Sequence, residues 1–294
     1  MSAPSLAPGT ASDTAARPAY EPMPVRVWRS GPEGEAAAAD RNLPDETPVA
    51  ILYDGATYAV MMATPCDLTD FAVGFTLTEG VARPDQIEEV EVAAHPLGMQ
   101  VRVWLAPAQA EAVRHRARRL AGPVGCGLCG VESLTEAARP VPRVETPLSV
   151  APGRILEAMA ALAPNQPVHM ATRSTHAAGF WLPQRGLVTV REDVGRHNAL
   201  DKLIGALASV PGGDAVAECA GAVLLTSRVS VEMVQKTAAA GIPMIVAVSA
   251  PTTLAVDAAE PAGVTLVAVA RRDGFEVFTH PHRIAFGEAQ AACA

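Results

Sequence analysis

Apolar positions are spaced differently in the two halves of the chain, and this difference predicts two parts of unlike architecture. In residues 25–147, short β-rich runs alternate with two helical stretches. After residue 147, continuous apolar strands alternate with amphipathic helices, a pattern that indicates a layered α/β domain. We therefore expect the fold class α/β, with a small α+β part at 25–147 and a larger layered α/β domain at 148–294.

The first part is expected to hold two hairpins and two helices. Two β-rich runs within residues 48–63 flank Asp54-Gly55, which is a strong hairpin signal. A second strand pair surrounds the turn at 95–98. The helices expected here are 71–77 and 107–120.

The second part is expected to alternate helices with strands. The expected helices are 153–162, 197–208, 231–240 and 252–259. The expected strands are 186–191, 222–226, 244–249, 264–270 and 276–279. Residues 1–24 are rich in Ala, Pro, Ser and Thr without periodicity, and this composition predicts a disordered tail.

Composition and charge narrow the classes of function. Of the 294 residues, 49% are hydrophobic, and the formal net charge of −8 argues against non-specific binding to nucleic acid. No apolar run approaches the ~20 residues of a membrane-spanning helix, and no signal peptide opens the chain. The five cysteines are too few, and odd in number, for a secreted disulfide framework. We expect a soluble protein of the reducing cytoplasm, without a membrane or nucleic-acid partner.

Two thiols stand out as candidate chemistry. The segment VGCGLCG places Cys126 and Cys129 three positions apart among glycines. Glycine leaves little bulk around the sulfurs and suits an accessible loop better than a helix interior or a central strand. A thiol on such a loop can meet another protein or a large ligand, and its thiolate is the reactive form. Chemistry at sulfur is therefore the leading hypothesis for this loop.

Other uses of a CxxC motif are weaker here. A dithiol oxidoreductase is the second hypothesis, although a thioredoxin-like motif follows a first strand and this one follows a helix and a Gly-Pro break. A structural zinc site, the third, needs about four ligands, of which the motif supplies two. A zinc deaminase would require an H-x-E sequence, which the chain lacks. We therefore expect no metal site.

Three polar clusters interrupt the second part at the expected junctions between strands and helices. The clusters are 172–178, 192–198 and 226–232. Helix N-termini beyond strand ends offer free N–H groups and a favourable dipole to anions. We expect these clusters to line a site for a phosphate-bearing ligand, although capping and hydrogen bonding within the fold explain the same residues. The candidate ligand-binding residues are His176, His197, Arg228 and Ser230.

Several long motifs in order resemble the FdhD family. They are GCGLCGVESL, EDVGRHNALDK, VEMVQKTAAAGIPMIVAVSAPTTLAV and THPHRI. The resemblance runs from Val25 to Phe286. This family comprises sulfur carriers, or accessory sulfurtransferases, needed for formate dehydrogenase. The resemblance also implies a second half similar in fold to cytidine deaminases.

The resemblance implies a cargo, two partners and a set of residues. Such proteins take sulfur as a persulfide from a cysteine desulfurase and pass it to the molybdenum cofactor, a bis(molybdopterin guanine dinucleotide), of the formate dehydrogenase catalytic subunit. They bind the guanine nucleotide part of that cofactor. The persulfide-bearing thiol falls on Cys126, and Cys129 is placed to resolve or shield the persulfide. The cofactor-binding stretch falls on Val269, Ala270, Arg271, Arg272, Asp273 and Gly274.

Some readings stay open beside this one. A maturation chaperone that holds the cofactor without sulfur transfer would carry the same motifs. A homodimer is compatible with a site at the junction of two parts, but no residue demands it. The family usually has glycines where this chain has Arg173, Ser174 and Ser227. The remaining cysteines, expected to be inert, are Cys66, Cys219 and Cys293.

Overall fold

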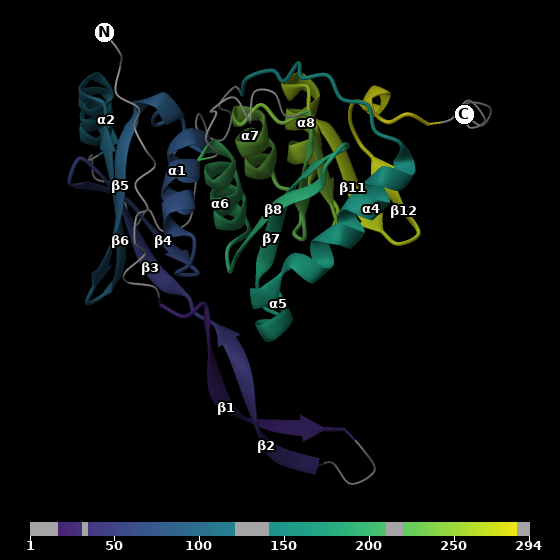
Figure 1. Ribbon diagram of the computed structural model, residues 1–294, viewed down its shortest axis with the longest axis horizontal. Coiled ribbons are helices and arrows are strands. Elements are labelled where there is room, and N and C mark those ends of the chain that lie inside the picture. Colours follow the sequence, from purple (N-terminus) through teal and green to yellow (C-terminus); the bar gives the residue numbers. More distant parts are fainter. Residues whose placement is uncertain (1–16, 31–34, 121–140, 210–219, 287–294) are drawn as a thin grey trace.

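The structure, a computed structural model, describes residues 17–30, 35–120, 141–209 and 220–286. Within these ranges the chain forms two α/β units that pack side by side and a two-stranded ribbon that projects from them (Figure 1). The predicted mixed α/β class is confirmed. The likeness to cytidine deaminases stays a prediction. None of the described helices combines the length and apolar character that crossing a membrane requires.

The first unit is a four-stranded sheet in the order β4-β3-β6-β5, covered by helices. Its elements are β3 (Thr47–Tyr53), β4 (Ala56–Ala63), α1 (Leu68–Thr78), η1 (Pro84–Gln86), β5 (Ile87–His95), β6 (Gly98–Leu105) and α2 (Pro107–Leu120). Both predicted hairpins are present. Asp54 and Gly55 have φ values of 47° and 82°, the left-handed backbone that a two-residue hairpin turn of type I′ requires.

The second unit is a six-stranded sheet in the order β12-β11-β10-β9-β7-β8. Its strands are β7 (His176–Leu182), β8 (Gly186–Asp193), β9 (Ala222–Leu225), β10 (Met244–Ala247), β11 (Thr265–Arg271) and β12 (Gly274–Val277). Its helices are α4 (Pro152–Leu162), η2 (Ala163–Asn165), α5 (Pro167–Thr172), α6 (Arg196–Ala208), α7 (Val231–Ala239), α8 (Thr253–Ala262) and η3 (Pro281–Arg283).

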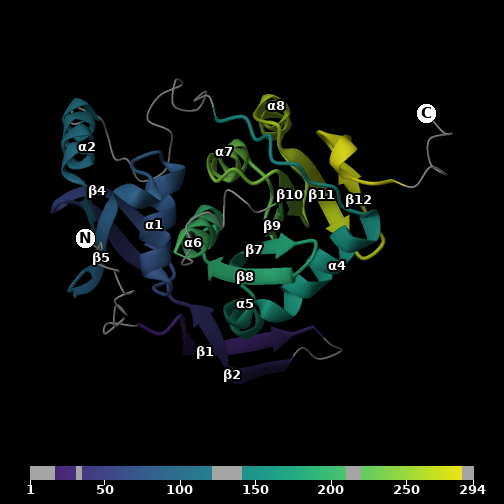
Figure 2. The same ribbon diagram turned by 45° about the horizontal axis from the view of Figure 1, so that its top comes forward.

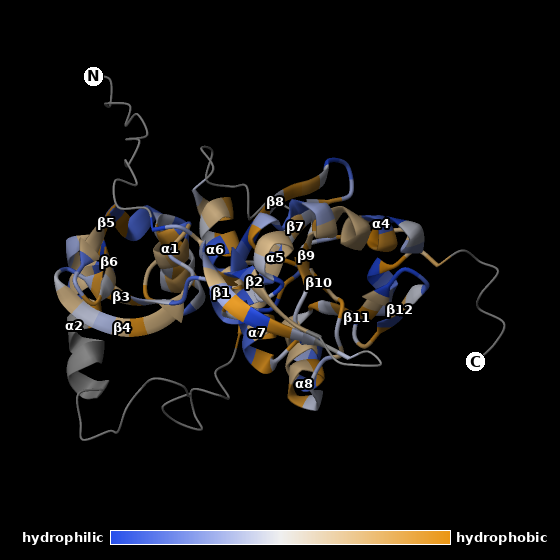
Figure 3. Ribbon diagram, turned by 90° about the horizontal axis from the view of Figure 1, so that it is seen from below, coloured by the Kyte–Doolittle hydropathy of each residue, from blue (hydrophilic) through white to orange (hydrophobic). Residues whose placement is uncertain are grey.

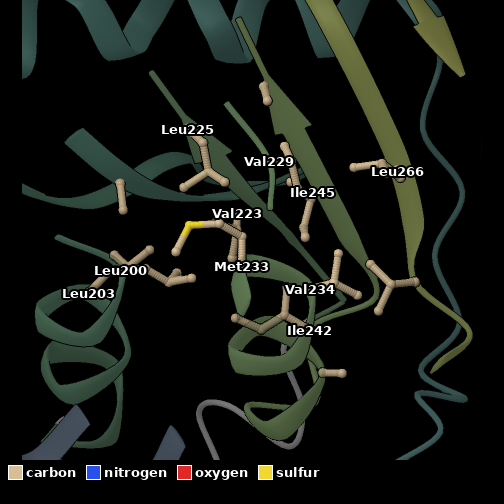
Figure 4. Close-up of a cluster of buried hydrophobic side chains, with 14 of the residues drawn as sticks. Leu200, Leu203, Val223, Leu225, Val229, Met233, Val234, Ile242, Ile245 and Leu266 are labelled. Carbon is tan, nitrogen blue, oxygen red and sulfur yellow. The ribbon is translucent and has the colours of Figure 1, made fainter. Parts of the chain in front are cut away.

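Helices cover both faces of this sheet, which explains its continuous apolar strands (Figure 2). In β9, Val223 and Leu225 face the core formed with α6, α7 and α8, where they lie with Met233 and Ile245 (Figure 4). Leu224, the residue between them, faces the core on the α4 side. Both sides of the strand are therefore buried, so strict alternation of apolar and polar residues is absent.

The directions of the strands determine which strand ends lie together at one edge of the sheet. Strands β9, β10 and β11 run parallel, while β7 runs antiparallel to β9 and β8 antiparallel to β7. The C-terminal ends of β8, β9, β10 and β11 therefore lie at one edge together with the start of β7. We call this edge, with the loops that follow it, the carboxyl edge.

The sequence predictions missed several elements. The tail predicted for 1–24 extends too far, because β1 (Tyr20–Arg29) pairs with β2 (Glu35–Pro44) from Tyr20 onward. Neither α5 nor β7 was expected. Because both are present, the cluster 172–178 joins a helix to a strand rather than a strand to a helix. The boundary expected after residue 147 also comes too late. Val144 already belongs to the core of the second unit, and its N–H donates to the carbonyl of Ala262 (2.8 Å).

The two units meet where α1 packs against α6. A Cβ added at Gly74 would lie 1.7 Å from the carbonyl oxygen of Asp201, and one added at Gly205 would lie 1.8 Å from that of Asp70. The two helices therefore approach backbone to backbone through glycines. This contact joins the units into a single body.

Candidate functional site

The three predicted polar clusters come together at the carboxyl edge, where hydrogen bonds tie neighbouring loops to one another. The Thr226 hydroxyl accepts from the N–H of Ala177 at the start of β7 (2.8 Å). The Val248 N–H donates to the carbonyl of Leu225 (3.1 Å). The Val269 N–H in turn donates to the carbonyl of Ser249 (3.4 Å). Loops from four strands are thus held side by side.

The motif EDVGRHNALDK lies at this edge, and most of its polar side chains form hydrogen bonds or ion pairs within the fold. Glu192 caps the start of α5, since its carboxylate accepts from the N–H groups of Val168 (2.9 Å) and His169 (2.7 Å). Asn198 donates to the Asp193 carboxylate (3.0 Å) and to the carbonyl of Met62 (2.8 Å). These two side chains are therefore structural.

The remaining acids of this motif, Asp193 and Asp201, and its lysine, Lys202, take part in two buried ion pairs. Lys202 Nζ lies 2.7 Å from Asp193 Oδ2 and donates to the carbonyl of Thr64 (2.8 Å). Asp201 accepts from Lys236 Nζ (2.9 Å) and from the Thr78 hydroxyl (2.7 Å). Because Thr64 and Thr78 belong to the first unit, both pairs bind one unit to the other.

Arg196 and His197 are the exceptions within the motif. They open α6 at the carboxyl edge, and the buried atoms Arg196 Nε and His197 Nε2 have no hydrogen-bond partner in the described part of the chain. Burial, together with the positive charge of Arg196, lowers the pKa of His197 to about 4, so this imidazole is neutral at pH 7. Burial and then Arg196 also lower the pKa of His176, which places His176 in the field of the same guanidinium.

The start of α7 lies beside the start of α6. His197 Nε2 is 3.8 Å from Glu232 Oε2 in the first turn of α7. Ser230 is the N-cap of α7 and is buried, but its side chain makes no capping bond to the helix. Arg228 is exposed at the same loop. The structure thus gathers His176, His197 and Ser230 around two adjacent helix N-termini, where an anion is favoured.

The stretch Val269–Gly274 lies farther along the edge, because β10 separates β11 from β9. Val269 has a φ of 51°, at an irregularity in the pairing of β11 with β12. Positive φ is a genuine outlier for a β-branched residue, and such strain gathers at ligand-binding sites. Ala270 packs into the core, whereas Arg271, Arg272 and Asp273 are exposed at the turn.

The carboxyl edge is rich in arginine although the chain is acidic overall. The arginines on or beside it are Arg41, Arg173, Arg196, Arg228, Arg271 and Arg272. Guanidinium groups recognise phosphate through paired hydrogen bonds. The edge can therefore hold a multiply charged anion of the kind predicted. Arg196 belongs to this edge as well; the sequence analysis placed it in the cluster 192–198 without naming it among the candidate ligand-binding residues.

The predicted sulfur chemistry falls elsewhere in the chain. Cys126, Cys129, Cys219 and Cys293 lie outside the described residues. Cys66 is half-buried, and burial raises the pKa of its thiol to about 11 even though Lys202 Nζ lies 4.0 Å from its sulfur. Cys66 is therefore a thiol at neutral pH, in agreement with the expectation that it is inert.

Comparisons with known proteins agree with the motifs. The FdhD/NarQ family matches residues 44–285. A protein named "Sulfur carrier protein FdhD" from Agrobacterium fabrum is 50% identical over 254 residues, which span 86% of this chain and 92% of that protein. A protein of the same name from Cupriavidus necator is 44% identical, over 97% of this chain and 96% of its own length.

A solved structure supports the same assignment. The crystal structure of a "putative formate dehydrogenase accessory protein" from Desulfotalea psychrophila superimposes with a TM-score of 0.69 at 27% sequence identity. The match covers 91% of this chain and 100% of that one. With the motifs, the relatives and the fold in agreement, the chain belongs to the FdhD/NarQ family.

Proposed function

We propose that this chain is a sulfur carrier that accepts persulfide sulfur on Cys126 from a cysteine desulfurase and delivers it to the molybdenum cofactor of formate dehydrogenase. The observation that carries this proposal is the match to relatives named as sulfur carriers over 86–97% of the chain. The GCGLCG motif supplies the thiols that such a role requires. Its place of action is the reducing cytoplasm.

The first step is a thiolate exchange. The Cys126 thiolate attacks the terminal sulfur of the donor's persulfide, the sulfur–sulfur bond of the donor breaks, and the donor cysteine leaves as a thiolate that takes up a proton. A new persulfide then stands on Cys126, and no net oxidation has occurred. The carrier is thus a sulfurtransferase that holds its substrate covalently.

Release of the sulfur as sulfide requires two electrons, which Cys129 can provide. The Cys129 thiolate attacks the Cys126 sulfur, and the terminal sulfur leaves as hydrosulfide. The two thiols become a disulfide while the transferred sulfur is reduced. A cellular dithiol restores both thiols before the next cycle.

The cargo is held at the carboxyl edge. A bis(molybdopterin guanine dinucleotide) carries pyrophosphate groups, and the α6 N-terminus meets them with the neutral His197 and with Arg196 Nε, which no described residue bonds. Arg228 and the exposed pair Arg271 and Arg272 extend the positive surface toward the nucleotide part. This side of the protein binds and orients the cofactor, while the thiols supply the sulfur.

Intact-protein mass spectrometry tests the carrier role directly. Wild type, Cys126→Ala and Cys129→Ala are incubated with an active cysteine desulfurase and cysteine, with Cys66→Ala as the matched control. We expect Cys129→Ala, which cannot resolve the persulfide, to gain one sulfur atom that reductant removes, and Cys126→Ala to gain none. Wild type and the control should show either the same gain or the loss of two hydrogens that marks the Cys126–Cys129 disulfide. Absence of the gain on reduced Cys129→Ala would contradict the proposal.

A maturation assay separates sulfur transfer from a pure holding role. Cells that lack their own carrier receive wild type or Cys126→Ala, and formate dehydrogenase activity is measured in extracts. We expect Cys126→Ala to leave the dehydrogenase inactive. An active dehydrogenase with this variant would instead identify a cofactor chaperone that uses no sulfur chemistry.

A further inference from the structure

The backbone at Arg173 has a conformation that suits glycine better than arginine. Arg173 ends α5 with φ 61° and ψ 24°, and its N–H donates to the carbonyl of His169 (2.7 Å). Glycine is the usual residue of such a left-handed cap, because a Cβ is unfavourable there. The side chain of Arg173 is exposed, and no described residue bonds its guanidinium. The stability of the fold therefore gives no reason for an arginine at this position.

The register of β7 and β8 places Arg173 at the same end of the sheet as Arg196. His176 at the start of β7 pairs with Asp193 at the end of β8. Arg173 stands three residues before His176, and Arg196 stands three residues after Asp193, so each lies within about 10 Å of that pair. Burial and then Arg196 lower the pKa of His176, so the charge of Arg196 acts at the start of β7. Both guanidinium groups can therefore reach one ligand of the size of a nucleoside diphosphate.

A third arginine adds positive charge beside Arg173. Figures 1 and 3 show α5 next to the base of the ribbon formed by β1 and β2. From this ribbon, Arg41 donates to the carbonyl of Thr172, the residue before Arg173 (3.5 Å). Like charges held close together repel one another unless a counterion meets them. An anion at the carboxyl edge would relieve this repulsion.

The carboxylates at the neighbouring strand end are bonded within the fold and not to these arginines. Glu192 accepts from the Thr175 hydroxyl (3.2 Å) in addition to the N–H groups at the start of α5. Asp193 is paired with Lys202 (2.7 Å). The acids closest in sequence to Arg196 therefore leave the guanidinium groups of the edge available to a ligand.

Buried polar atoms at the starts of α6 and α7 are also available. Three of them have no hydrogen-bond partner in the described part of the chain, namely Arg196 Nε, His197 Nε2 and Ser230 Oγ. The Ser230 side chain is 9% exposed, so bulk water does not readily replace a missing partner. Two helix N-termini, unmet polar atoms and arginines together indicate a ligand with more than one negative charge.

We propose that Arg173 is a phosphate-binding residue of this chain, whose guanidinium binds a phosphate group of the nucleotide part of the cargo together with the start of α6. Guanidinium groups bind phosphate through paired hydrogen bonds. This inference rests on the proposed function, because the ligand is the nucleotide-bearing cofactor. It adds a residue whose backbone is strained where glycine would relax it, and strain of this kind gathers at ligand-binding sites.

Substitution by glycine separates binding from folding at this position. Arg173→Gly relaxes the left-handed backbone and removes the guanidinium, whereas Arg173→Lys keeps a positive charge on the same backbone. Arg185→Ala is the charge control, because Arg185 is exposed in the turn that joins β7 to β8 at the opposite end of the two strands. Equilibrium dialysis with labelled GDP gives the Kd of each protein. Calorimetry without ligand gives each melting temperature.

Binding and stability should change in opposite directions. We expect Arg173→Gly to raise the Kd for GDP about tenfold and to melt about 2 °C higher than wild type. Arg173→Lys should lose less affinity than the glycine variant, and Arg185→Ala should bind as wild type does.

The possible failures are distinguishable. If wild type binds GDP and Arg173→Gly binds it as tightly, the inference is overturned while the cargo site stands. Weaker binding together with a lower melting temperature would also overturn it, because the loss would then come from disruption of the end of α5. A wild type that binds no GDP would overturn the cargo site itself and this inference with it.

Discussion

Lys202 Nζ lies 2.7 Å from Asp193 Oδ2, and neither side chain has any exposed surface. Asp193 also accepts from the N–H groups of Thr64 (3.0 Å) and Gly195 (2.7 Å), so every charge in this pair is met by several partners. The pair sits where the segment after β4 meets the junction of β8 and α6. It fixes the first unit against the loop that presents Arg196 and His197.

Breaking this pair should destabilise the protein strongly. Lys202→Met leaves the buried Asp193 carboxylate without its cation, and we expect a loss of about 3–5 kcal/mol in the free energy of unfolding. Urea unfolding followed by circular dichroism measures it. Arg102→Gln, which removes a surface ion pair with Glu91, should cost less than about 1 kcal/mol. Equal losses in the two variants would show that the buried pair has no special role.

Glycine at the contact between α1 and α6 should also be hard to replace. In Gly74→Ala the new Cβ would lie 1.7 Å from the carbonyl oxygen of Asp201, so the helices must separate. We expect a loss of at least the ~1–3 kcal/mol typical of overpacking. Gly153→Ala in α4 meets no atom within 4 Å and should gain up to about 1 kcal/mol. Calorimetric melting of the two variants should therefore shift in opposite directions.

Local sequence signals predicted those elements that are bounded by residues with strong turn or helix-end preferences. Asp54-Gly55 marked the first hairpin, and the span of α2 was predicted to the residue. The ribbon was missed because Pro22 and Pro24 read as disorder, although prolines are tolerated on an unpaired edge. Strand β7 was missed because it opens with the small residues of HAAGFWL.

The site was harder to predict because its polar residues divide between two roles that sequence does not separate. Asp193 and Arg196 stand three positions apart in one motif. The first is bonded to Thr64, 129 residues away along the chain, whereas the Nε of the second has no hydrogen-bond partner among the described residues. Only the tertiary partners distinguish a structural side chain from one left for a ligand. For this reason the cluster 192–198 was predicted as a whole, but of this pair only His197, and not Arg196, was named as a candidate.

Arg196 should be required for nucleotide binding but not for folding. Loss of a charge-assisted hydrogen bond to phosphate weakens binding by about 10- to 100-fold, so we expect Arg196→Ala to raise the Kd for GDP by that factor. Equilibrium dialysis with labelled GDP measures the change. Arg154→Ala, which removes an exposed ion pair with Glu157 on α4, should bind as wild type. An unchanged Kd in Arg196→Ala would exclude this side chain from the site.

Cys66 should resist alkylation in the native protein. A pKa near 11 instead of 9.0 lowers its thiolate fraction at pH 7.5 by about 100-fold, and the rate of reaction with iodoacetamide falls with it. Peptide mass mapping after timed labelling gives this rate, and labelling in urea supplies the unfolded reference. Rapid native labelling of Cys66 would show that it is a second reactive thiol, and Cys66→Ala would then no longer serve as a neutral control.

His197 should make the protein less stable in mild acid. Its pKa is about 4 in the folded chain and near 6.5 when unfolded, so between these values the unfolded state binds more protons. The stability that neutral His197 contributes is thus present above pH 6.5 and is lost as the pH falls toward 4. Three charged groups act on this imidazole, namely Arg196, Glu232 and Lys236, and burial outweighs the favourable one, Glu232.

Replacement of His197 isolates this effect. We expect His197→Gln to show a smaller drop in the urea midpoint between pH 7 and pH 5 than wild type. His95→Gln, at an exposed hairpin turn, should keep the wild-type drop. An identical drop in all three proteins would mean that His197 is as easily protonated in the fold as in the open chain, and that Arg196 and burial do not hold it neutral. That result would also remove the argument that a neutral imidazole faces the anion at the start of α6.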